Sequence, residues 1–109
     1  MLISNEILKQ LPTLDAVKQA GFDLFNAKAL VKFLTPGDKW TWYALAFDGE
    51  DLFFGFINGN VPELGYFRLS ALEHGRSAAS HPVICDPDYQ PETLRQLLQQ
   101  YVRLFVVAQ

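Results

Sequence analysis

Residues 33–69 read FLTPGDKWTWYALAFDGEDLFFGFINGNVPELGYFRL. Ten of the chain's fifteen aromatic residues lie in this stretch, in short apolar runs separated by Pro-Gly-Asp, Asp-Gly-Glu-Asp and Asn-Gly-Asn. Aromatic and β-branched runs favour strands, and the intervening Gly, Asn, Asp and Pro residues favour tight turns. The stretch therefore predicts an antiparallel β-meander with many rings to bury or to present.

The predicted meander has four strands, at residues 28–35, 40–47, 52–57 and 63–69. Side chains alternate between the two faces of a strand, so Trp40 and Trp42 are expected to share one face. Tyr43, Leu45 and Phe47 are expected to share the other. The first strand is expected to point three residues the same way: Ala29, Val31 and Phe33. Both faces carry bulky rings, so one is expected to meet helices and the other to be covered by loops or used for binding.

Short helices are predicted before and after the meander. Ser4 is a suitable N-cap for a helix that ends at Pro12, and Gly21 is a suitable stop for a second helical segment. Ser70 and Glu73 have the spacing of a capping box, which predicts a short helix directly after the fourth strand.

A longer amphipathic helix is expected to begin near Pro91, a residue that suits a first helical turn. Its apolar residues follow the spacing of one buried face: Leu94, Leu97, Leu98, Tyr101, Val102 and Phe105. Residues 75–90 are predicted to be irregular. The expected fold class is α+β, with a four-stranded antiparallel meander, short helices and this C-terminal helix.

The composition indicates a single domain over residues 1–109. Half of the residues are apolar and the net charge is −3, so the chain has material for a core and lacks the basic excess of many nucleic-acid-binding proteins. Cys85 is the only cysteine, which excludes an intramolecular disulfide. The sequence shows no secretory signal and no apolar run of roughly 20 residues. We expect a cytoplasmic protein with no membrane partner, either a monomer or a homodimer.

The chain resembles a family of small uncharacterised proteins that share a domain of unknown function. The resemblance rests on these segments: residues 8–12, Phe33-Leu34-Thr35-Pro36, Trp40-Thr41-Trp42-Tyr43, residues 47–51, Phe53-Phe54-Gly55, Glu63-Leu64-Gly65-Tyr66-Phe67 and residues 70–73. The resemblance implies a place on bacterial plasmids and integrating conjugative elements, and it implies no established activity. Residues 15–27 and Cys85 depart from the family pattern, and the last helix resembles an extension.

The aromatic residues of the meander have two interpretations. Trp and Tyr dominate binding hot spots, whereas the same residue types also fill the cores of sheets. The residues that we select as a candidate partner-binding surface are Trp40, Trp42, Tyr43, Glu63 and Tyr66. They lead to the first functional hypothesis, a non-enzymatic protein-interaction module that binds a host or mobile-element protein, for example as an inhibitor of a host defence system.

The alternative hypothesis is a nucleic-acid-associated accessory protein in plasmid replication or transfer. Its candidate contacts are Lys28, Lys32 and Arg68. The residues between Lys39 and Arg68 include no Lys or Arg, but they include four acids that repel phosphates: Asp48, Glu50, Asp51 and Glu63. Stacking platforms for single strands combine aromatic side chains with a basic groove, so this alternative is the weaker one.

Metal binding and catalysis have little support in the sequence. The loop that contains His74, His81, Cys85, Asp86 and Asp88 matches no zinc-ligand spacing. The acids around Gly49 match no EF-hand loop, and turn formation explains them better. We therefore expect no metal, no cofactor and no catalytic residue.

Overall fold

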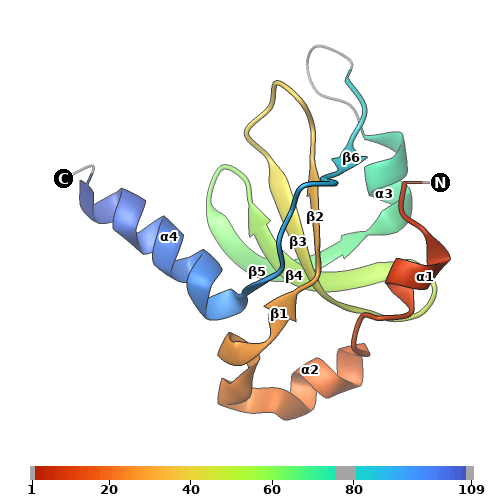
Figure 1. The fold of residues 1–109 in the computed structure, drawn as a ribbon, viewed down its shortest axis with the longest axis horizontal. Coiled ribbons are helices and arrows are strands. Elements are labelled where there is room, and N and C mark those ends of the chain that lie inside the picture. Colours follow the sequence, from red (N-terminus) through yellow and green to blue (C-terminus); the bar gives the residue numbers. More distant parts are fainter. Residues whose placement is uncertain (1, 76–80, 108–109) are drawn as a thin grey trace.

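A computed structural model describes residues 2–75 and 81–107, with side chains described up to residue 100 (Figure 1). Its main sheet has five antiparallel strands in the order β5-β4-β3-β2-β6. The strands are β2 (Val31–Leu34), β3 (Thr41–Phe47), β4 (Leu52–Asn58), β5 (Pro62–Arg68) and β6 (Ile84–Cys85). The predicted α+β class and the antiparallel meander are confirmed.

Two short segments depart from the prediction. Residues 84 and 85, expected in an irregular region, form β6 and extend the sheet beyond β2. The predicted first strand is interrupted at Leu30, so that β1 (Lys28–Ala29) leaves the main sheet and pairs with β7 (Glu92–Thr93). As a result Ala29 packs with Leu45, on the opposite side of the sheet from Val31 and Phe33, and the expectation that these three share a face was wrong.

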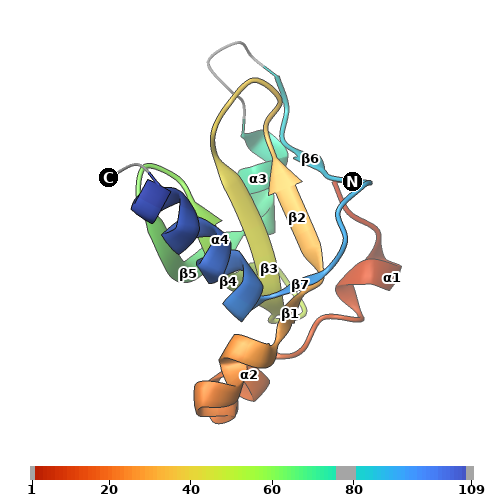
Figure 2. The same cartoon turned by 60° about the vertical axis from the view of Figure 1, so that its left-hand side comes forward.

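Both faces of the sheet are covered, and each has its own apolar cluster. The first cluster is formed by sheet residues such as Phe33 and Phe53 with the segments around α1 (Asn5–Leu8) and α3 (Leu69–His74). The second is formed by Leu45 and Phe56 with α4 (Leu94–Val107) and the 3-10 helix η1 (Gly21–Asn26). Figure 2 shows α3 and α4 on opposite sides of β3. The sheet is therefore the middle layer of three.

A β-bulge in β3 decides which aromatic residues enter each cluster. Ala44 pairs with Gly55 and Ala46 pairs with Phe54, so that Leu45 is an extra residue with no partner opposite it. The extra residue reverses the alternation of side chains beyond it. Tyr43 and Leu45 lie in the second cluster but Phe47 lies in the first, so the expectation that all three share a face was wrong.

The N-terminal helices begin where the local signals predict, but α1 ends at Leu8, four residues before the predicted end at Pro12. The Ser4 hydroxyl accepts a hydrogen bond from the Ile7 N–H at 3.3 Å and caps α1. Thr13 caps α2 (Leu14–Ala20) in the same way through the Ala16 N–H at 3.1 Å. Gly21 ends α2 with a φ of 56°, a backbone conformation that favours glycine.

The two later helices are capped differently from the prediction. Arg68 is the N-cap residue of α3, and the Ser70 side chain donates to Asp51 rather than closing a capping box with Glu73. The capping box of the chain lies at α4, which begins at Leu94 and not near Pro91. There the Thr93 hydroxyl accepts from the Gln96 N–H at 3.1 Å and the Gln96 side chain accepts from the Thr93 N–H at 2.8 Å.

The predicted apolar face of α4 is buried over its first half. Leu94 and Leu97 are buried in the second cluster, and Leu98 packs against it. Tyr101, Val102 and Phe105 lie outside the described side chains. Within the described ranges, every helix is too short or too polar to cross a lipid bilayer.

Candidate functional site

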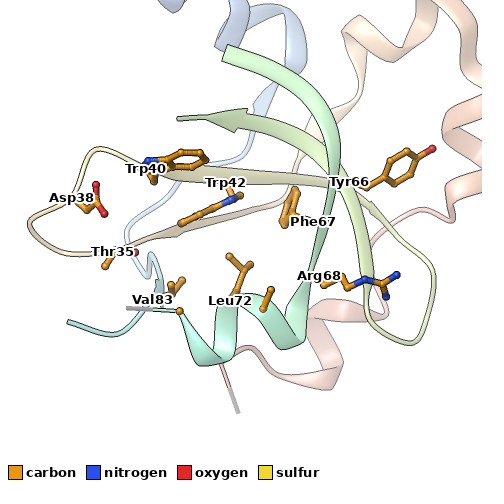
Figure 3. A pocket seen from close by; sticks show the side chains of 11 residues that line it. Thr35, Asp38, Trp40, Trp42, Tyr66, Phe67, Arg68, Leu72 and Val83 are labelled. Carbon is orange, nitrogen blue, oxygen red and sulfur yellow. The ribbon is translucent and has the colours of Figure 1, made fainter. Parts of the chain in front are cut away.

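A groove with a volume of about 500 Å³ lies between the sheet and α3. Its floor is the end of the sheet that carries Trp42 and Phe67, and one wall is α3 with Ala71 and Leu72 (Figure 3). The described residues that complete the lining are Thr35, Asp38, Trp40, Tyr66, Arg68, Gly75 and Val83. A volume of this size is in the range of pockets that bind ligands or partner side chains.

Two tryptophans give the groove its aromatic surface. Trp42 is in β3 and Trp40 precedes it by two residues, so both rings lie on the same side, with centroids 5.9 Å apart and planes 30° apart. The Trp40 ring lies directly over Gly59, where a Cβ atom would come within 2.5 Å of the ring. Glycine at position 59 therefore provides the space for the Trp40 ring, and both rings are half-buried rather than fully enclosed.

Opposite charges lie at the two ends of the groove. Asp38 is exposed in the turn between β2 and β3, and its carboxylate accepts a hydrogen bond from the Lys39 N–H at 2.6 Å. Arg68 is at the end of β5, and its guanidinium lies 3.7 Å from the Asp51 carboxylate. Figure 3 shows Asp38 and Arg68 on opposite sides of the tryptophan pair. An occupant of the groove would meet a negative end and a positive end.

The structure separates the predicted partner-binding residues into three places. Trp40 and Trp42 line the groove. Tyr43 lies on the opposite face of the sheet, where its ring contacts those of Phe56 and Tyr89. Glu63 and Tyr66 are exposed on β5. Tyr66 borders the groove, but its ring points away from it (Figure 3) and contacts Phe54.

Sequence reasoning missed several residues of the groove. Thr35 immediately follows β2, Leu72 is in α3 and Val83 immediately precedes β6. No local pattern marks these residues as neighbours, because the chain folds back from three separate segments to bring them together. The only sequence signal was the pair of tryptophans two residues apart in a predicted strand.

The three candidate nucleic-acid residues do not form one basic surface. Lys32 is in β2, its ammonium lies 3.9 Å from the Asp86 carboxylate and it also lies over the Tyr43 ring at 5.6 Å. Arg68 is in β5, which is separated from β2 by the two strands β4 and β3, and it faces Asp51. Lys28 is exposed in β1, outside the main sheet. Two of the three cations are thus paired with carboxylates.

The acidic turn after β3 binds its own backbone. One Asp48 carboxylate oxygen accepts hydrogen bonds from the N–H groups of Glu50, Asp51 and Leu52 at 2.8, 2.9 and 3.0 Å. The Asp51 carboxylate accepts from both the N–H and the hydroxyl of Ser70, at 2.8 and 2.7 Å. These contacts lower the pKa of Asp48, chiefly through Leu52 and Glu50, and the pKa of Asp51 through Ser70. Turn formation explains the acids of this hairpin.

This arrangement predicts a loss of stability in acid. Because folding lowers the pKa of Asp48 below its ordinary value of 3.8, the ionised carboxylate stabilises the fold above that pH and the contribution disappears as the pH falls through the folded pKa. Asp48→Asn keeps an acceptor oxygen but cannot titrate. We expect the urea midpoint of this variant to fall less between pH ~6 and pH ~3 than that of the wild type. The control is Asp23→Asn, at an exposed carboxylate of η1, and its urea midpoint should change with pH as that of the wild type does. The same change of midpoint with pH in all three proteins would contradict a stabilising role for the ionised Asp48 carboxylate.

The histidine and cysteine residues do not assemble a metal site in the part of the chain that is described. Within residues 2–75 and 81–107, no three His, Cys, Asp or Glu side chains are placed to share a metal ion. Cys85 is half-buried in β6, and burial, with a smaller effect of Asp86, raises the pKa of its thiol. A raised pKa reduces the thiolate fraction and hence the reactivity of the cysteine.

Tyr89 is a structural residue that sequence reasoning did not select as a candidate site residue. Its hydroxyl donates to the Ala29 carbonyl at 2.9 Å and accepts from the Glu92 N–H at 3.2 Å. Burial raises the pKa of this phenol to about 12. The neutral hydroxyl therefore links β1 to the segment that enters β7 and α4.

The sequence matches a protein family over residues 2–105, almost its full length, and the family is described as "Protein of unknown function (DUF2958)". The chain belongs to this family. The DUF2958 match includes residues 15–27 and most of α4, so the last helix falls within the matched length rather than extending beyond it. No curated protein and no solved structure matches the chain significantly.

Proposed function

We propose that this DUF2958 protein is a non-enzymatic protein-interaction module and that its binding site is the groove between the sheet and α3. The observation that carries the proposal is the pair of half-buried tryptophan rings between Asp38 and Arg68. Trp and Arg are enriched among the residues that carry most of the binding energy in protein interfaces. The groove offers two Trp side chains, and Arg68 lies at its rim with the guanidinium beside Asp51.

The charges at the ends of the groove indicate the chemistry of the partner. A segment that lies along the groove would bring an apolar or aromatic side chain to the Trp pair. A basic residue of that segment would lie near Asp38, and an acidic residue would lie near Arg68. Oppositely charged groups at an interface fix the orientation of the partner and accelerate its association. The proposed occupant is therefore a protein segment with an apolar centre and charged flanks.

The side chains of the described lining support binding more than chemistry. Its charged side chains are Asp38 and Arg68, and they lie at opposite ends. Catalytic acid–base pairs and nucleophile–base pairs need groups within hydrogen-bond reach of each other. The resemblance to proteins of plasmids and conjugative elements supports the further proposal that the partner is a host or mobile-element protein, with a component of a host defence system as one concrete case.

Filling the groove is the direct test. Ala71 is exposed on α3 and lines the groove, so Ala71→Gln adds bulk there without disturbing the core. The matched control is Glu73→Gln, on the same helix and outside the lining. After nuclease treatment, we expect wild type and Glu73→Gln to capture the same host protein from a lysate. Capture by Ala71→Gln should fall by ~10-fold or more, because a blocked hot spot removes most of the binding energy.

The alternative outcomes are distinct. Equal capture by Ala71→Gln and the wild type would place the binding site elsewhere. Capture that disappears with nuclease would favour the nucleic-acid alternative. Circular dichroism and urea unfolding of both variants show whether a loss of capture reflects the groove or the fold.

A further inference from the structure

Strand β5 forms one edge of the sheet and exposes apolar side chains there. It pairs with β4 on one side, and no strand within residues 2–75 or 81–107 pairs with its other side. Leu64 is 41% exposed and Tyr66 is 53% exposed. Long apolar edge strands usually carry a lysine, a proline or a covering loop that prevents pairing with another chain. On the face of β5 that carries Leu64 and Tyr66, the first charged residue after Pro62 is Arg68 at the end of the strand.

The pairing register shows which backbone groups of β5 face outward. In an antiparallel ladder, hydrogen-bonded and non-hydrogen-bonded pairs alternate. The Leu69 N–H donates to the Asp51 carbonyl at 2.8 Å. Every second residue of β5 before Leu69 is therefore in a hydrogen-bonded pair with β4. These residues, whose backbone groups face inward to β4, are Phe67, Gly65 and Glu63. The remaining residues direct their backbone groups outward, which agrees with Pro62, a residue with no N–H to leave unpaired.

We propose that β5 pairs antiparallel with β5 of a second copy of the chain, with the two-fold axis at Gly65. In this register Leu64 of each copy lies opposite Tyr66 of the other. Each of these two pairs exchanges two N–H···O bonds between outward-facing backbone groups. The two sheets become one continuous sheet, and both exposed apolar side chains of each strand are covered.

The sequence of β5 favours a second copy over a foreign strand. Leu64 and Tyr66 are symmetric about Gly65, so an identical strand covers an apolar side chain with an apolar side chain at both positions. A register centred on Leu64 would instead put Tyr66 opposite Pro62. One centred on Tyr66 would put Leu64 opposite Arg68. An interface of this kind is isologous, which is the commonest arrangement of homodimers.

Cysteine cross-linking tests the register. In a Cys85→Ser background, Gly65→Cys places the new thiol opposite its own copy, at the ~4.5 Å Cα separation of a non-hydrogen-bonded pair, which a disulfide can span. The site tolerates a side chain, because the nearest atom to a Cβ at Gly65 is Ile57 Cδ1 at 3.7 Å. Under mild oxidation we expect a reducible covalent dimer for Gly65→Cys and little for Leu64→Cys or Tyr66→Cys. Preferential cross-linking at 64 or 66 would overturn the register.

Sedimentation tests the interface without cysteines. We expect the wild type to dimerise, and Tyr66→Lys to weaken dimerisation by ~10-fold or more, because a charge at an edge opposes strand pairing. The control is Ile84→Lys, at the opposite edge of the same sheet, with unfolding curves to confirm that both variants fold. A monomeric wild type, or a dimer that only Ile84→Lys disrupts, would overturn the proposal. The oligomeric state is measured separately from partner capture: Ala71 is on α3 rather than on β5, so Ala71→Gln should dimerise like the wild type.

Discussion

Phe53→Ala is expected to lower the free energy of unfolding by about 3–5 kcal/mol, the range for a fully buried phenylalanine. Phe53 has no exposed surface. Its ring centroid lies 5.5 Å from that of Phe33, 4.8 Å from that of Phe47 and 5.2 Å from that of Phe67. Removing the ring opens a cavity at the centre of the first cluster and ends all three contacts. Since small domains are stable by about 5–15 kcal/mol, the loss would be a large part of the total.

Urea unfolding followed by tryptophan fluorescence measures this effect. The control is Phe22→Ala, because Phe22 is 89% exposed on η1 and its truncation should change stability by no more than about 0.5 kcal/mol. A cost below about 1 kcal/mol for Phe53→Ala would mean that the cluster around β4 is not packed as described.

The meander was predictable because its signals are local. Alternation of apolar residues set the strands, and turn residues such as Asp48-Gly49 set their ends. The Asp48 carboxylate folds over three backbone N–H groups, and Gly49 has a φ of 91°. Ser4 and Gly21 mark helix boundaries for the same reason, since a cap depends on residues within one turn of the chain.

Features that depend on distant residues were not predictable. Strand β6 has two residues and forms because β2 lies beside it. Helix α3 begins where the Asp51 carboxylate, 19 positions earlier, accepts from Ser70. No short window of sequence contains both partners of such a contact, so the local capping-box pattern at Ser70 gave the correct helix for the wrong reason.

The candidate site also combines features that local sequence predicts with features that depend on distant residues. Strand alternation correctly placed Trp40 and Trp42 on one face, because both precede the bulge. The position of Tyr43 on the other face followed from the same rule. The α3 wall of the groove and Val83 did not follow, because they depend on how α3 and the segment before β6 pack on the sheet. Sequence reasoning thus found the aromatic half of the groove and missed the rest.

The bulge at Ala44 and Ala46 leads to the second large effect. Gly55→Ala is expected to lower the free energy of unfolding by about 3 kcal/mol, the upper part of the range for overpacking. A Cβ atom at Gly55 would lie 1.8 Å from the Tyr43 carbonyl oxygen and 2.9 Å from its carbonyl carbon. Both are backbone atoms in a central strand, so no side-chain rotation can relieve the clash, and β3 or β4 must shift at the bulge.

Gly65→Ala is a matched control, because Gly65 is the cross-strand partner of Gly55 in β5. A Cβ atom there meets only Ile57 Cδ1 at 3.7 Å, an ordinary contact. The same substitution in paired strands should therefore be costly at 55 and change stability by no more than ~0.5 kcal/mol at 65. Chemical denaturation of both variants measures the difference. Equal effects at the two positions would show that the close approach of β4 to the Tyr43 carbonyl is absent in solution, and with it the bulge that assigns Phe47 to the first cluster.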